Sequence, residues 1–373
     1  MTSSVVGAPL VDWTSAAQIA ARVAPPGPTA SRAELAALVA GLRDAASAAV
    51  PHVLRVTGMT PADPAGSPEA ARTGTAVLSR VYVVDRSRWA RANTEVMASL
   101  TDGVADSLTG GGDKPVSATT ALVGAAQVGA VLAALSSRVL GQFDPYSAHG
   151  TPGRGRLLLV APNVLQLERD LDLVPADFRL WVCLHEQTHA LQFAAAPWLA
   201  QHLRASAREL LGGLSESSRQ LAEARLRDKL ATAGGVVLRA VRGQEGGVAH
   251  GLLTPEQRRS LEEVSAVMAL LEGHADVMMD AVGRATVPTV RRIRAQFEAR
   301  RDGQGSSTLD TVLRRFLGMD AKLAQYRDGA AFVRGVEKQV GREGLNAVWS
   351  SPERLPSARE IADPGAWVRR VHG

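Results

Sequence analysis

The sequence has little cysteine, lysine or aromatic residue, and each shortage excludes a class of protein. A single cysteine, Cys183, excludes an intramolecular disulfide framework and a cysteine-rich zinc module. One cysteine fits a reducing compartment, and residues 1–24 carry no basic stretch that leads into an apolar run. We therefore expect a cytoplasmic protein without a secretory signal. Because aromatic residues make up only 4% of the chain, Leu, Val and Ala must fill most of the core.

Lysine is scarce: only four of the 42 basic residues are Lys, and the others are Arg. The formal net charge is +5 and the pI is about 9.8. The densest arginine cluster, at 291–301, lies near Glu298 and Asp302 and contains one aromatic residue, Phe297. Nucleic-acid-binding surfaces commonly interleave basic residues with exposed aromatic residues that stack on bases. We therefore expect this cluster to be a solvated helix face, and we expect no nucleic-acid partner.

One stretch, from Ala118 to Ser137, carries no charged residue. Its apolar residues are mostly Ala, with several Gly among them, and Gln127 stands near its centre. This composition is weakly hydrophobic for a membrane span. It favours a helix buried in a soluble core, and we expect no membrane span.

Capping signals place two long helices. Ser31 followed by Glu34 forms a capping box, and we expect that helix to end before Pro51. Thr254 followed by Gln257 opens a second helix, which we expect to reach about residue 282.

The remaining pattern predicts few strands. Residues 156–161 are the best strand candidate, and 80–85 form either a short strand or the lead into a helix. The stretch 213–250 combines a charged helix with glycines and is typical of an insertion. We expect a mainly helical α+β fold with few short strands. Residues 1–30 would form an N-terminal arm, and 31–373 one domain or two tightly joined lobes.

The motif that carries chemistry is His185-Glu186-Gln187-Thr188-His189. Residues four apart on a helix lie on the same face, so two imidazoles can bind one Zn²⁺ ion from adjacent turns. Glu186 is rotated off the ligand face and lies beside the metal, where a general base is needed. With eight His and 18 Glu in the chain, composition alone yields about 0.01 such matches.

The surroundings of the motif indicate a buried helix, because residues 180–184 are apolar without a gap and apolar residues follow the motif. Burying two histidines and a glutamate there costs several kcal/mol unless they have partners. A metal site supplies such partners. The alternative interpretation is a pair of hydrogen-bonded core histidines.

A third protein ligand is expected from the helix that begins at residue 255. Glu272 lies in an apolar part of it, and Asp276 follows one turn later on the same face. A carboxylate at that position matches the acceptor that a metal-bound imidazole needs for its remaining N–H. Gly273 would let this helix approach the His185 helix closely. His274 is the alternative third ligand, but it points about 200° away from Glu272 on a helical wheel.

The motif followed by a later Glu-x-x-x-Asp helix resembles the gluzincins, the thermolysin-like branch of the zincin metallopeptidases. More narrowly, the chain resembles an uncharacterised bacterial zincin-like family labelled as candidate hydrolases or as deazaflavin-coenzyme-biosynthesis-associated proteins. The matching segments lie at 84–86 near Trp89, 138–145, 185–189, 272–276, 325–327, 332–334, 355–356, 362–364 and 367–368. The resemblance implies a zincin-like fold, in which the active-site helix packs against a second ligand-bearing helix, but no particular substrate. It implies zinc at His185, His189 and Glu272.

These residues predict a zinc-dependent hydrolase, and we expect a metallopeptidase that acts on a peptide or amide bond. Zn²⁺ would be the cofactor, Glu186 the general base, and Asp276 the residue that orients a ligand histidine. The active-site cleft would lie between the segments 178–194 and 255–282. The alternative is a non-catalytic, zinc-stabilised scaffold that binds a partner.

Overall fold

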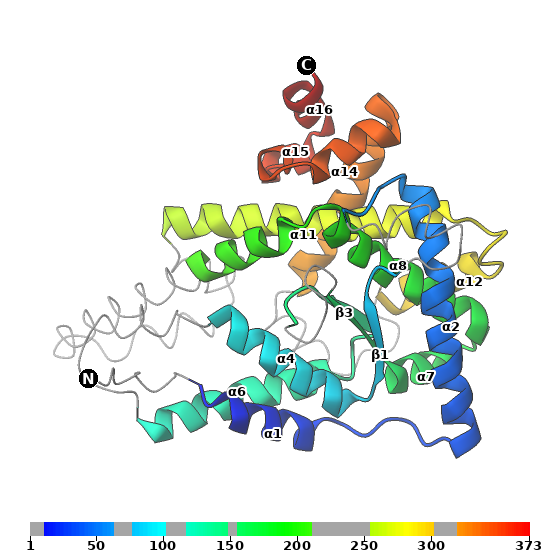
Figure 1. Ribbon diagram of the computed structural model, residues 1–373, viewed down its shortest axis with the longest axis vertical. Helices are drawn as coiled ribbons and strands as arrows, with labels where there is room; N and C mark the ends of the chain where they lie inside the picture. The colour runs from blue at the N-terminus through cyan, green and yellow to red at the C-terminus, as the bar shows by residue number, and fades with distance from the viewer. Residues whose placement is uncertain (1–10, 63–76, 102–116, 148–154, 211–253, 302–318) are drawn as a thin grey trace.

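The computed structural model describes residues 11–62, 77–101, 117–147, 155–210, 254–301 and 319–373 (Figure 1). The insertion expected at 213–250 lies outside these residues. In chain order the helices are α1 (Trp13–Val23), α2 (Arg32–Thr57), α4 (Arg86–Thr101), α6 (Ala118–Leu135), α7 (Ala161–Asp170), α8 (Pro175–Ala195), α11 (Pro255–Ala281), α12 (Val290–Arg301), α14 (Met319–Asn346), α15 (Ala358–Ala362) and α16 (Pro364–His372). Two 3-10 helices, η3 (Ala347–Trp349) and η4 (Pro352–Arg354), precede α15. The mainly helical class is therefore confirmed.

The three strands β1 (Arg80–Val84), β2 (Gly141–Asp144) and β3 (Arg156–Val160) form one sheet in the order β1-β3-β2. β1 runs parallel to β3, and β2 runs antiparallel to it with Gly141 opposite Leu159. The strand at 156–161 was expected, and of the two alternatives at 80–85 the structure has the strand; β2 was not expected. Its four residues are too few to show an alternating pattern. It matters most for the site, because it packs against α8.

The sheet separates two hydrophobic clusters. Leu157 and Leu159 contribute to the larger cluster, with α2, α8, α11 and α14, whereas Leu158 and Val160 face a smaller one that includes residues of α1, α4 and α6. This alternation is the period of two that a strand imposes on its side chains. Figure 1 shows α1, α4 and α6 on one side of the sheet and α8 and α11 on the other.

The prediction that α2 ends before Pro51 is wrong. The helix begins as expected, with the Ser31 capping box, but continues to Thr57 and ends at Gly58, whose φ is +63°. Pro51 is exposed, while Val50 and Leu54 beside it are buried in the larger cluster. A proline inside a helix costs about 3 kcal/mol. The burial of the α2 face against α8 offsets this cost.

The uncharged helix α6 packs against α1 and α4. A Cβ atom at Gly129 would lie 2.9 Å from the Ile19 side chain, so the glycine permits the close approach of α1. Among the described helices, α6 alone is long and apolar enough to span a membrane by length and composition. Only 28% of it is buried, because Leu122, Val123 and Val131 are exposed. It contacts two neighbouring helices, but it is not the buried core helix that the sequence predicted.

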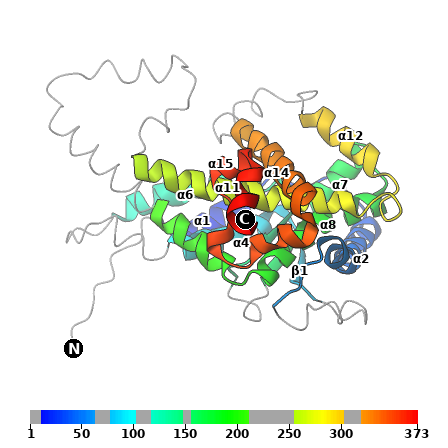
Figure 2. The ribbon, with the colours of Figure 1, turned by 90° about the horizontal axis from the view of Figure 1, so that it is seen from above.

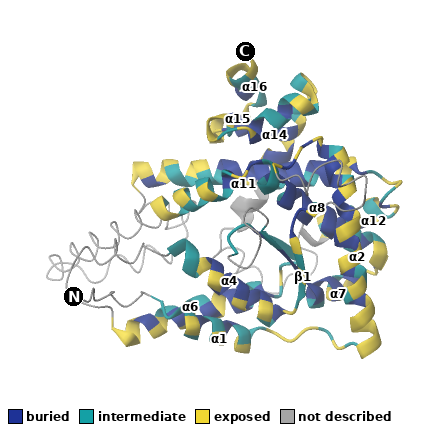
Figure 3. Ribbon diagram, viewed as in Figure 1, coloured by how far each residue is buried: buried dark blue, intermediate teal, exposed yellow. Residues whose placement is uncertain are grey.

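α11 is the helix that joins the site to the C-terminal part of the chain. It begins with the expected capping box, in which Thr254 and Gln257 bond reciprocally. Figure 3 shows that α8 and the central part of α11 are buried. Seen from above in Figure 2, α15 and α16 lie over α11 and α14, and α15 packs against both of these helices whereas α16 packs against α14. The close approach expected at Gly273 is made to α14 and not to α8, because a Cβ there would lie 2.1 Å from the carbonyl carbon of Gly329.

Candidate metal centre

α8 presents the two histidines of the motif on one face. It begins with Pro175 at its first position and is buried from Trp181 to Leu184, as the apolar run predicts. His185 and His189 follow this run one turn apart, and their rings meet edge to face with centroids 4.6 Å apart.

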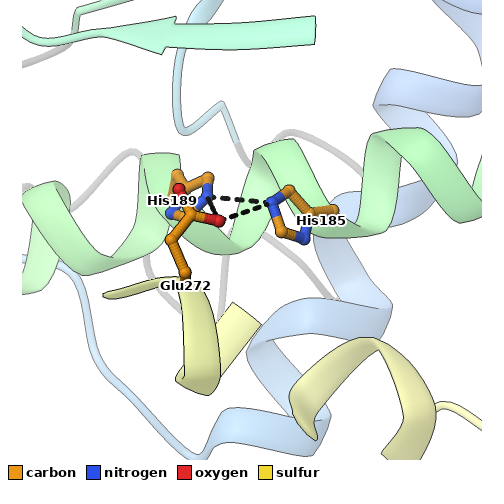
Figure 4. Close-up of side chains that lie close together, drawn as sticks. All are labelled: His185, His189 and Glu272. Atoms are coloured by element: carbon orange, nitrogen blue, oxygen red, sulfur yellow. Dashed lines mark hydrogen bonds and ion pairs between the residues drawn. The ribbon is translucent and has the colours of Figure 1, made fainter. Parts of the chain in front are cut away.

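Glu272 of α11 completes a cluster of three possible metal ligands (Figure 4). The Nε2 atoms of His185 and His189 lie 3.0 Å apart, and Glu272 Oε2 lies 3.3 Å from the first and 3.6 Å from the second. Zinc–ligand bonds of about 2.1 Å at the tetrahedral angle place neighbouring ligand atoms about 3.4 Å apart. The three observed distances lie around this value, so the donor set and its spacing fit a tetrahedral metal ion.

The cluster is open on one side. The side chains of His185 and Glu272 are 27% and 20% exposed, and both line a cavity of about 870 Å³ together with Glu186. Three protein ligands and an open position are the arrangement of catalytic zinc sites, whereas structural sites are closed by a fourth protein ligand.

Glu186 lies beside the histidines against β2. It is 7% exposed, and a Cβ atom at Gly141 would lie 2.6–2.8 Å from the Glu186 side chain. Burial raises the pKa of Glu186, although the neighbouring histidines and the backbone N–H of Phe143 favour its charged form. A carboxylate with a raised pKa is a stronger base near neutral pH.

Opposite charges hold the cluster together. Burial alone would lower the pKa of His189, but the Glu272 carboxylate outweighs it and raises that pKa to about 9. Burial alone would raise the pKa of Glu272, but His189 and His185 outweigh it and hold the pKa far below its usual range. The cluster therefore pairs a negative carboxylate with a cationic imidazole.

Sequence reasoning missed Gln192, which contacts His189. Its Oε1 lies 2.9 Å from His189 Nδ1, so the amide accepts the ring proton that points away from the cluster. The spacing could have predicted this contact, because Gln192 follows His189 by three residues and side chains at i and i+3 lie close together on a helix.

The structure differs from expectation at Asp276. Within the described part of the chain, its carboxylate accepts a hydrogen bond from Arg294 Nη1 at 2.6 Å and none from either ligand histidine. Arg294 also bonds to Asp280 and lies over the ring of Trp181. The arginine cluster on α12 is therefore only partly a solvated face, because Arg294 reaches into the cavity.

His274 is placed behind the cluster and does not join it. It is fully buried, with Nδ1 3.0 Å from Gln192 Nε2 and its ring edge against Trp349. Burial, Arg342 and His189 lower its pKa to about 3. Of the two candidates for a third ligand, the structure brings Glu272 to the histidines.

Cys183 is a core residue. It is fully buried, with Sγ 3.9 Å from the carbonyl oxygen of Leu42. Burial and the Glu186 charge raise the pKa of its thiol, which disfavours the reactive thiolate.

Comparisons with known proteins agree with this geometry. A profile of the zincin-like metallopeptidase family matches residues 11–368. A crystal structure of a candidate hydrolase with a novel fold from Chloroflexus aurantiacus is similar over 96% of this chain and 98% of that chain, with 30% identity and a TM-score of 0.61. No match was found among curated proteins. The family match covers nearly the whole chain and implies a metal, typically zinc, which the cluster of His185, His189 and Glu272 could bind. The chain belongs to the zincin-like metallopeptidase family.

Proposed function

We propose that this protein is a zinc-dependent hydrolase that cleaves a peptide or amide bond. The observation that carries the proposal is the triangle of His185 Nε2, His189 Nε2 and Glu272 Oε2, which opens into a cavity beside a buried carboxylate, Glu186. A zinc ion bound there would lower the pKa of water and polarise a carbonyl group.

Residues around the cluster would transfer the proton and position the ligands. Glu186 accepts a proton from the attacking water and passes it to the leaving amine. Its burial among Gly141 and the backbone of Phe143 keeps it beside the histidines and in one orientation. Gln192 holds the ring of His189.

The position of β2 favours a peptide substrate. β2 is an edge strand of the sheet, it packs against α8, and its first residue, Gly141, lines the cavity. An extended peptide can add to a strand edge through main-chain hydrogen bonds. Bound in that way, its backbone would pass beside Glu186. We also expect the protein to be soluble and cytoplasmic, with no nucleic-acid partner.

Metal analysis and a hydrolysis screen test the proposal together. Protein purified without chelator should contain about one zinc ion per chain. His185→Ala and His189→Ala should lose it, and wild-type protein should cleave members of a peptide and amide library. Protein that neither contains nor takes up zinc would refute the proposal. Protein that keeps zinc yet cleaves nothing would favour the zinc-stabilised scaffold.

A further inference from the structure

Gln192 connects the two helices that carry the candidate metal ligands. It is fully buried, and its Oε1 lies 2.9 Å from His189 Nδ1 on α8. Its Nε2 lies 2.9 Å from the carbonyl oxygen of Leu271, the residue directly before Glu272 on α11. One amide therefore contacts a ligand ring and the backbone beside another ligand.

The partners of Gln192 fix the direction of every hydrogen bond in this group. The Leu271 carbonyl can only accept, so the amide atom beside it must be the N–H₂ group. The other amide atom is then the oxygen, which can only accept, so His189 Nδ1 must carry a proton. When the ring is neutral, its lone pair is then on Nε2, the atom that faces the other candidate ligands.

His274 and Trp349 support the amide from behind. The second N–H of Gln192 points to His274 Nδ1 at 3.0 Å, so His274 accepts there. The His274 ring is fully buried and meets Trp349 edge to face at 5.1 Å. His274 is therefore not a ligand, but it has a structural role, because it accepts the remaining N–H of the Gln192 amide.

We propose that Gln192 is a positioning residue that builds the zinc site before the metal binds. It holds His189 with the proton on Nδ1, and it ties the His189 ring to the backbone that carries Glu272. This inference rests on the proposed function only in taking His189 as a zinc ligand. Gln192 itself is not one of the candidate ligands and does not line the cavity.

The test compares Gln192→Met with Gln187→Met. Met has a similar volume to Gln but neither donates to Leu271 nor accepts strongly from His189. Gln187 is a matched control, because it is a buried glutamine of the same helix that donates to the Ala46 carbonyl oxygen at 3.0 Å. Zinc affinity is measured by competition with a chromophoric chelator. Gln192→Met should weaken it by about 10- to 100-fold, the usual effect of losing a partner of a ligand histidine. Gln187→Met should leave it unchanged.

NMR supplies a second readout that general loss of packing would not imitate. In the zinc-loaded wild type the Nδ1 proton of His189 should exchange slowly, and in Gln192→Met its signal should be lost. If that variant does not fold, Gln192→Glu, which still accepts from His189, must retain the signal. Three results would overturn the inference. The first is that Gln192→Met weakens zinc affinity no more than Gln187→Met does, and the second is that it leaves the affinity unchanged. The third is that Gln192→Glu loses the signal of the His189 Nδ1 proton. Wild-type protein that does not bind zinc would instead overturn the proposed function.

Discussion

Replacing Gly141 by alanine should disable Glu186 without removing the metal. A Cβ atom at this position would lie 2.6 Å from Glu186 Cγ and 2.7 Å from Cδ, whereas ordinary contacts begin at 3.4 Å. Gly141 has no positive φ, so its backbone accepts alanine, and the three atoms nearest to the new Cβ all belong to Glu186. Relief requires the carboxylate to move by about 1 Å, and such a displacement costs on the order of 10²-fold in rate.

The assay is kcat/KM on a substrate found by library screening, with zinc content measured on the same preparation. Gly141→Ala should lower kcat/KM about 100-fold and keep the zinc. Its control is a double-mutant cycle with Glu186→Gln, because a change that acts only through Glu186 should add nothing once that carboxylate is gone. Full activity in Gly141→Ala would refute the reasoning, and so would a further loss in the double variant.

Three other predictions concern the metal and the fold. Glu272→Ala should abolish stable zinc binding in elemental analysis, whereas His274→Ala should retain it; the reverse pattern would identify His274 as the ligand. Because the pKa of His189 is raised to about 9 in the metal-free protein, zinc must displace its proton at lower pH. Zinc affinity by chelator competition should therefore rise about tenfold per pH unit from pH 6.5 towards 9, and a flat profile would contradict the paired state. Gly273→Ala would place a Cβ 2.1 Å from the backbone of Gly329, so urea unfolding should show a loss of about 3 kcal/mol, and a loss below about 0.5 kcal/mol would contradict the close packing of α11 on α14.

The sequence predicted the parts of the site that follow from helical spacing. His185 and His189 are four residues apart, so their shared face required only that the segment be a helix. Capping boxes located the starts of α2 and α11 for the same reason, since they are local patterns.

What the sequence could not predict depends on contacts between distant segments. β2 is four residues long and is a strand because β3 pairs with it, so it carries no periodic signal of its own. Asp276 has the right spacing to serve a ligand histidine, but α12 brings Arg294 to it from 18 residues away. Gln192, in contrast, has a role that its sequence position did not predict. Its partner Leu271 lies 79 residues away and orients the amide.

The central claim is that Glu186 is the base of a metal-dependent hydrolase, and Glu186→Gln tests it most directly. The amide has the shape of the carboxylate but cannot accept the proton of the attacking water. With zinc content and turnover measured on one preparation, the variant should keep its zinc. It should lose about 10²- to 10⁴-fold in turnover, the usual contribution of a positioned general base. A variant that keeps its zinc and turns over substrate like the wild type would contradict the mechanism.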